Sequence, residues 1–168
     1  MQIKTVHSKA DIEAFLHLPF MINEGNPNWI APLQQDVEKV FDPKKNPFFS
    51  HGECERWILT DDSGKTIGRI AAFINKTLAY TEDVPTGGCG FFEVINDKAA
   101  AFLLFDTAKK WLTERGMQAM DGPINFGERN AFWGLLVEGF TEPTYQICLL
   151  YTSPSPRDRT RSRMPSSA

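Results

Sequence analysis

The sequence predicts one α+β domain in which helices flank a mixed, mostly antiparallel sheet. Three observations lead to this prediction: apolar residues recur at helical and then at strand spacing, a hairpin turn separates two strands, and a strand–helix–strand unit follows. The chain has 168 residues, of which 42% are hydrophobic and 23% charged. This composition is globular, and the length allows a single hydrophobic core.

The first third of the chain predicts a short strand and two helices. A strand is expected at residues 3–6. Ser8, with Asp11 three positions later, resembles a capping box at the start of a helix. This helix should end before Pro19, because proline has no backbone N–H to donate. A second helix is expected at residues 33–41, where apolar residues repeat at i, i+4, i+7 and i+8.

The middle of the chain predicts a meander of three strands, at residues 56–60, 66–74 and 88–94. The first two are rich in isoleucine and phenylalanine and are joined by Asp61-Asp62-Ser63-Gly64-Lys65, which is typical of a hairpin turn. The residues before the first of these strands, 42–49, predict a loop.

A strand–helix–strand unit is expected to follow the meander. Asn96 or Asp97 caps a long helix over residues 98–115, and Gly116 ends it. A strand at residues 117–121 then leads into a Gly-Pro turn.

The last residues of the chain differ from the rest in composition. Residues 148–168 are rich in serine, proline and arginine and show no apolar period, so we expect 147–168 to be a disordered tail outside the domain of residues 1–146. A basic tail for an acidic partner is one interpretation. The string also resembles a translated sequencing adapter, which would make it non-native and the domain incomplete at its C-terminal end.

Charge and cysteine content indicate the class of partner and compartment. The net charge is −3 although the tail is basic, so the body is acidic and nucleic acid is not an expected partner. The sequence contains no run of 18 apolar residues, so no membrane span is expected. Cys54, Cys89 and Cys148 form no CxxC pair, which favours reduced thiols in the cytoplasm. His51, Glu53 and Cys54 lie too close together in sequence to surround a zinc ion, so no metal site is expected.

Several motifs together resemble one bacterial family. They are Asn26-Pro27-Asn28-Trp29-Ile30-Ala31-Pro32-Leu33, Lys44-Lys45-Asn46-Pro47-Phe48-Phe49, Gly68-Arg69-Ile70-Ala71-Ala72, Gly90-Phe91-Phe92-Glu93 and Gly122-Pro123-Ile124-Asn125-Phe126. The family consists of GNAT-like (Gcn5-related N-acetyltransferase-like) proteins described as uncharacterised N-acetyltransferases. The resemblance implies a GNAT-like, acyl-CoA N-acyltransferase-like fold that is C-terminally truncated here, since family members are about twice as long.

The resemblance also implies an activity, the transfer of an acetyl group from acetyl-CoA to an amine. The cofactor would lie where the fourth and fifth strands separate, against Phe92, Val94 and Asn96. GNAT enzymes hold its pyrophosphate in a glycine-rich turn after an Arg or Gln, but residues 93–100 contain neither. Asp97 instead brings negative charge to the helix end where the pyrophosphate would lie.

Two kinds of site residue are expected. Glu93 ends the central strand, where a carboxylate could deprotonate the acceptor amine; a solvated glutamate is the alternative. Asn125, Glu128, Arg129 and Asn130 form the densest polar cluster, which could bind the acceptor or be an ordinary loop.

Two functions therefore remain open. The chain is either part of an N-acetyltransferase of unknown acceptor, completed by a missing C-terminal half, or a non-catalytic GNAT-like module that binds an acceptor or packs on that half.

Overall fold

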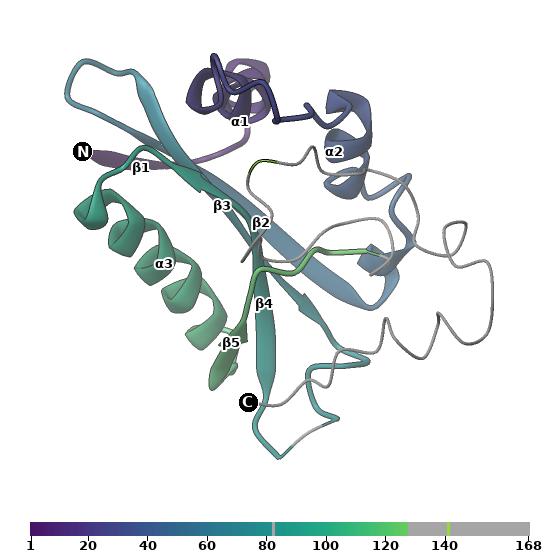
Figure 1. The fold of residues 1–168 in the computed structure, drawn as a ribbon. Helices are drawn as coiled ribbons and strands as arrows, with labels where there is room; N and C mark the ends of the chain where they lie inside the picture. The colour runs from purple at the N-terminus through teal and green to yellow at the C-terminus, as the bar shows by residue number, and fades with distance from the viewer. Residues whose placement is uncertain (82, 128–140, 142–168) are drawn as a thin grey trace.

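The computed structural model describes residues 1–81, 83–127 and 141 (Figure 1). Its elements in chain order are β1 (Gln2–Thr5), α1 (Lys9–Ile22), α2 (Gln34–Val40), the 3-10 helix η1 (Pro47–Ser50), β2 (Gly52–Thr60), β3 (Thr66–Asn75), β4 (Thr86–Val94), α3 (Lys98–Thr113) and β5 (Ala119–Asp121). The strands form one sheet in the order β1-β2-β3-β4-β5. The first three pairings are antiparallel, and β4 pairs with β5 in parallel.

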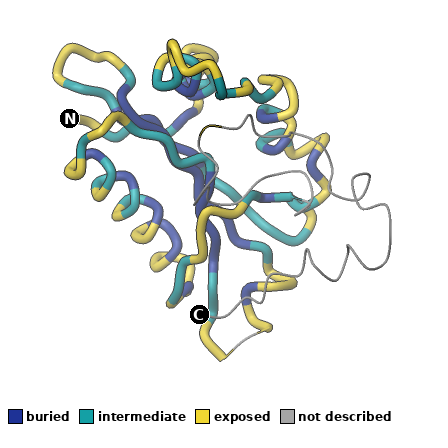
Figure 2. Tube along the Cα trace, in the orientation of Figure 1, coloured by how far each residue is buried: buried dark blue, intermediate teal, exposed yellow. Residues whose placement is uncertain are grey.

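Helices cover both faces of this sheet. In Figure 1, α3 lies along one face, which we call the α3 face, while α1 and α2 lie on the opposite side, which we call the α1 face. Figure 2 shows burial concentrated along the middle of the sheet and the inner side of α3. β3 is buried from Ile67 to Ile74, as expected for a central strand with a helical layer on each side.

Alternation along β3 separates two kinds of core. Ile70, Ala72 and Ile74 join an apolar cluster with Leu104 of α3. The intervening positions face α1 and α2, and Phe73 packs there beside Val40 and Phe126. Because successive side chains of a strand point to opposite faces, this one strand contributes to the core on both faces of the sheet.

Helix α1 begins as predicted but does not end where proline was expected to end it. Ser8 accepts from the Asp11 N–H at 3.1 Å, and the Asp11 carboxylate accepts from the Ser8 N–H at 3.0 Å, which completes the capping box. The helix continues through Pro19 to Ile22, so the predicted end was wrong. Proline leaves the Phe15 carbonyl without its helical donor, and Arg69 of β3 donates to that oxygen at 2.8 Å instead.

The turns around the meander and α3 follow the predicted chemistry. Gly64 has a φ of 85° in the β2–β3 hairpin, and Gly116 has a φ of 83° just after α3. Asp97 is the residue that caps α3, because its carboxylate accepts from the N–H groups of Ala99 at 2.8 Å and Ala100 at 3.1 Å.

Several element boundaries differ from the predictions by two or more residues. β2 begins at Gly52, four residues earlier than expected, because its first half pairs with the end of β3. The predicted loop at 42–49 contains the start of η1, where Asn46 caps the turn by accepting from the Phe48 N–H. β5 keeps only Ala119–Asp121, which is the length of its pairing with β4.

Across residues 1–81, 83–127 and 141, every helix is too short or too polar to traverse a bilayer.

Candidate functional site

The candidate site lies where β4 extends beyond the end of β5. The parallel pairing joins Thr86 to Ala119 and ends with Gly88 opposite Asp121, whereas β4 continues to Val94. Beyond β5 the chain crosses back over β4, and the Ile124 N–H donates to the Cys89 carbonyl at 2.9 Å. Ligands in sheets settle where strands part in this way, so this end of β4 is the natural place to look for a site.

A bulge in β4 occurs at the same place. Arg69 lies opposite Glu93 and Ala71 opposite Gly90, so β4 has one more residue than β3 over this stretch. Phe91, within the bulge, has a φ of 50°, which is uncommon for a bulky residue. Bulges re-aim side chains next to active sites, and here the bulge places both Phe91 and Glu93 on the α1 face.

Glu93 is paired with a buried arginine. Its Oε2 lies 3.0 Å from the Nε of Arg69, whose side chain is only 3% exposed, while Glu93 is 31% exposed. The two groups attract through charge without forming an aligned hydrogen bond. Burial raises the pKa of Glu93 above its usual value, and the Arg69 guanidinium opposes part of that rise. A half-buried carboxylate with a raised pKa can accept a proton nearer neutral pH than an exposed one.

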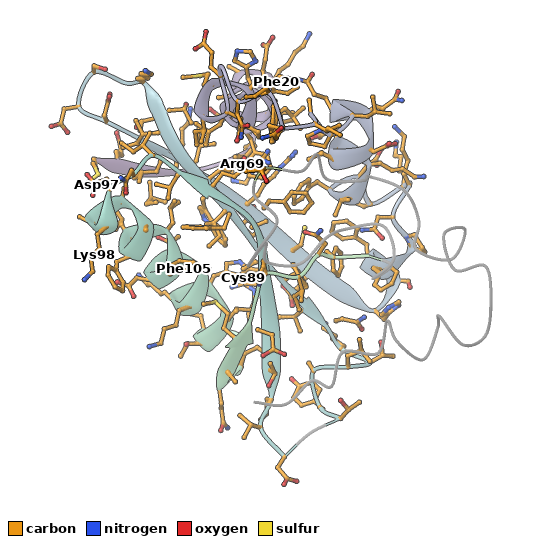
Figure 3. The ribbon with its side chains drawn as sticks, viewed as in Figure 1. Phe20, Arg69, Cys89, Asp97, Lys98 and Phe105 are labelled. Atoms are coloured by element: carbon orange, nitrogen blue, oxygen red, sulfur yellow. The ribbon has the colours of Figure 1, made fainter. Side chains whose placement is uncertain are left out.

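A second arginine lies in this layer, and its role was not predicted from the sequence. Arg56 of β2 donates to both carboxylate oxygens of Glu38, at 2.7 and 2.9 Å. Its guanidinium carbon lies 4.2 Å from the ring centre of Phe41 and 5.3 Å from that of Phe15. Arg69 lies 4.8 Å from the same Phe15 ring, between the sheet and α1 as Figure 3 shows. A sequence signal existed, since each arginine interrupts an apolar strand.

Asn125 reaches the same end of β4. Its Oδ1 lies 2.8 Å from the position that a Cβ on Gly90 would take, and the Ile124 carbonyl lies closer still. The absence of a side chain at Gly90 therefore lets this segment cross β4 beside the bulge. Of the predicted acceptor cluster, only Asn125 is placed; Glu128, Arg129 and Asn130 lie outside the described residues.

The predicted cofactor residues Phe92, Val94 and Asn96 come together at one groove. All three line an open groove of about 790 Å³ between the end of β4, the start of α3 and the end of α1. Phe92 stacks on Phe105 of α3, with ring centres 4.3 Å apart. The candidate site is thus divided by strand alternation: Glu93 lies toward α1, and its neighbours Phe92 and Val94 pack toward α3.

The start of α3 does not fit the pyrophosphate of a CoA. A helix N-terminus binds phosphate through free N–H groups and the positive end of its dipole. Here Asp97 already accepts from the N–H groups of Ala99 and Ala100, and its charge opposes an anion. Figure 3 shows Asp97 and Lys98 together at this end of the helix. The Lys98 ammonium lies 5.5 Å from the ring centre of Phe102.

Comparison with solved structures defines the class of fold. The structure named "Putative acetyltransferase from Agrobacterium tumefaciens str. C58" matches with a TM-score of 0.50 over 74% of this chain and 82% of that chain, at 9% identity. The chain therefore has the α+β fold of the GNAT acetyltransferases, as the sequence predicted. Sequence identity this low supports similarity of the fold alone.

Comparison with curated proteins finds two bacterial relatives. "Bacterial ceramide synthase" of Caulobacter vibrioides (strain NA1000 / CB15N) is 36% identical over 144 residues, which cover 85% of this chain and 37% of that protein. "Protein YghO" of Escherichia coli (strain K12) is 31% identical over 141 residues, which cover 84% of this chain and 35% of that protein. The chain thus spans little more than a third of the length of either relative. No family model matches it.

Proposed function

We propose that the chain is part of an N-acyltransferase, an enzyme that forms an amide from an activated acyl group and an amine. The observation that carries this proposal is the paired Glu93 beside the β4 bulge, in a fold of the acetyltransferase class. Transfer of an acetyl group from acetyl-CoA is the simplest form of this reaction. The start of α3 gives no support to CoA as the donor, so we derive no step through it.

The chain's own residues account for the acceptor side of the reaction. As the amine nitrogen bonds to the acyl carbon, the bond from that carbon to its leaving group breaks, and the leaving group departs with the electron pair. The nitrogen loses a proton in the same reaction, and the Glu93 carboxylate receives that proton. Arg69 holds the carboxylate in place through their 3.0 Å contact. Asn125, fixed across Gly90, is positioned to orient a polar group of the acceptor. Arg69 and Asn125 act as positioning residues, and Glu93 as the base.

The Caulobacter relative narrows the class of product. A ceramide is an amide between a fatty acid and a long-chain amino alcohol, so its synthesis is N-acyl transfer. With 36% identity over 144 residues, the relative favours a lipid amine as acceptor and an acyl group longer than acetyl. Because the chain spans so little of each relative, we further propose that another part of the same protein contributes to the complete site. Cys54 and Cys89 are free thiols, which fits a reaction in the cytoplasm.

A non-catalytic role is the second candidate, and one observation favours it. Asp97 occupies the N–H groups with which acetyltransferases of this fold would hold their cofactor. On this proposal the chain binds an acceptor or packs on a second GNAT-like part of the protein, and another segment carries the donor.

The test is amide formation measured by mass spectrometry. The 168-residue chain and the complete gene product are each incubated with an acyl thioester (acetyl and palmitoyl) and a long-chain amino alcohol, with the Caulobacter relative as positive control. We expect product from the complete protein, and about a hundredfold less from Glu93→Gln. No product with either donor, in a preparation where the relative is active, would favour the non-catalytic role.

A further inference from the structure

The groove at the end of β4 is apolar along most of its length. Met21 and Ile22 reach it from the end of α1, Phe92 and Val94 from β4, and Phe105 from α3. β4 and α3 follow one another in sequence, but α1 is far from both, so the groove exists only in the folded chain. Its volume of about 790 Å³ lies in the range of pockets that enclose a small ligand.

Its wall and rim leave apolar surface in contact with water. The stacked rings of Phe92 and Phe105, 26° from parallel, form a flat wall. Met21 and Ile95 line the groove while 37% and 41% exposed. These side chains offer a small apolar surface that an alkyl chain could cover.

The polar residues of the groove lie together in the turn between β4 and α3. Asn96, Asp97 and Lys98 are consecutive, and the Asp97 carboxylate accepts hydrogen bonds from the first N–H groups of α3. The groove therefore has a long apolar part and one short polar end. This division suits an amphiphile, and it does not suit a pyrophosphate.

We propose that this groove binds the alkyl chain of a long-chain substrate, in the position where other proteins of this fold class would hold the phosphates of CoA. The inference rests on the proposed N-acyl transfer and adds where one substrate chain lies. The chain could belong to the acyl donor or to the amine, because both carry the same alkyl chemistry. Asp97 and Lys98 carry opposite charges at the polar end, so a charged head of either sign would meet one opposite charge there.

The first experiment is a titration of the 168-residue chain by calorimetry with octyl, decyl and dodecyl amines, and with the fatty acids of the same lengths, each below its micelle concentration. Each added methylene that enters the groove should tighten binding about fourfold. Tighter binding of the amines would assign the chain to the acceptor, and tighter binding of the acids to the acyl donor. An affinity independent of chain length in both series would overturn the proposal.

A pair of variants locates the binding. Ala101 of α3 lines the groove, so Ala101→Trp should fill it and weaken dodecyl binding by about tenfold or more. Ala99 is exposed on the same helix and is not among the lining residues, so Ala99→Trp should bind as the wild type does. Circular dichroism checks that both variants keep their helix content. Equal affinities in the two variants would place the alkyl chain elsewhere and contradict the proposal.

The outcomes separate this inference from the proposed function. Alkyl binding that Ala101→Trp abolishes, without amide formation by the complete protein, would support the groove and contradict the transferase. Amide formation from acetyl and palmitoyl donors at equal rates, unaffected by Ala101→Trp, would support the transferase and contradict the groove. If alkyl chains fail to bind and Ala101→Trp changes the oligomeric state in size-exclusion chromatography, another protein surface covers the groove and the inference is wrong.

Discussion

The two faces of the sheet are held together by different means. On the α3 face, Leu104, Ala108 and Leu112 pack on the strands in a cluster whose buried members are all hydrophobic. On the α1 face, the buried arginines Arg56 and Arg69 lie among phenylalanine rings and carboxylates.

The two faces therefore differ in whether they offer groups for chemistry. An apolar layer excludes water and offers no group that can bind or move a proton. A layer with desolvated charges costs free energy to form and gives net stability only when the geometry is good, but it does offer groups that can bind or move a proton. On the α1 face, Arg69 pairs with Glu93 beside the bulge in β4, and Arg56 pairs with Glu38. We therefore expect substitutions on the two faces to differ in kind as well as in size.

The largest expected loss of stability comes from removing one member of the buried Arg69–Glu93 pair. Arg69→Met leaves Glu93 without its counter-charge and the Phe15 carbonyl without a donor, and should destabilise the fold by about 3–5 kcal/mol. Urea unfolding followed by fluorescence measures it. The double variant Arg69→Met/Glu93→Leu should recover part of the loss. If the double variant is less stable than the single one, the pair is not an electrostatic unit.

The next effect compares two glycines, one on each face. A Cβ on Gly90 would lie 1.9 Å from the Ile124 backbone oxygen, whereas one on Gly68 would lie 2.7 Å from the end of the flexible Leu104 side chain. Gly90→Ala should therefore cost about 3 kcal/mol or more, and Gly68→Ala about 1 kcal/mol. Thermal unfolding of the two variants gives the order. The reverse order would mean that residues 122–126 do not cross β4 as described.

A smaller effect is expected at the start of α1. Ser8→Ala removes the side-chain acceptor for the Asp11 N–H and should cost about 1 kcal/mol, whereas Ser8→Asp should restore most of it. The two midpoints in urea, measured under the same conditions, test this. An unchanged midpoint in Ser8→Ala would show that packing alone sets the position of α1.

The smallest effect is a dependence of stability on pH. The Lys4 ammonium, 2.6 Å away, and then the Ser8 hydroxyl hold the pKa of Asp11 well below its usual value. A depressed carboxyl pKa contributes stability that is present above the unfolded value, near pH 4, and is lost as the pH falls through the folded value. The stability difference between wild type and Asp11→Asn should therefore shrink between pH 6 and pH 3. The loss in Leu104→Ala should stay the same, because no titrating group is removed; a constant difference for Asp11→Asn would contradict the argument.

The sequence predicted the fold well because its signals are local. The capping box at Ser8 and Asp11, the hairpin residues around Gly64 and the apolar periods each depend on a few neighbouring residues. The continuation of α1 through Pro19 could not be predicted in this way. It depends on Arg69, which is fifty residues away and supplies the hydrogen bond that proline cannot.

The candidate site was predicted in part for the same reason. Phe92, Val94 and Asn96 follow one another along β4 and its turn, and the structure gathers them in one groove. The contribution of Met21 and Ile22 to that groove, and the pairing of Glu93 with Arg69, are tertiary contacts that no local pattern encodes.

On the proposed function, the α1 face carries the groups that take part in the reaction, whereas the cluster around Leu104 on the α3 face supplies no reacting group. The measurement that tests this difference is the single-turnover rate of amide formation per folded molecule. It compares the Glu93→Gln and Leu104→Ala variants of the complete protein. We predict that Glu93→Gln lowers the rate about a hundredfold. We predict that Leu104→Ala keeps the wild-type rate while losing about 2–5 kcal/mol of stability. A wild-type rate in Glu93→Gln across the pH range would contradict the account.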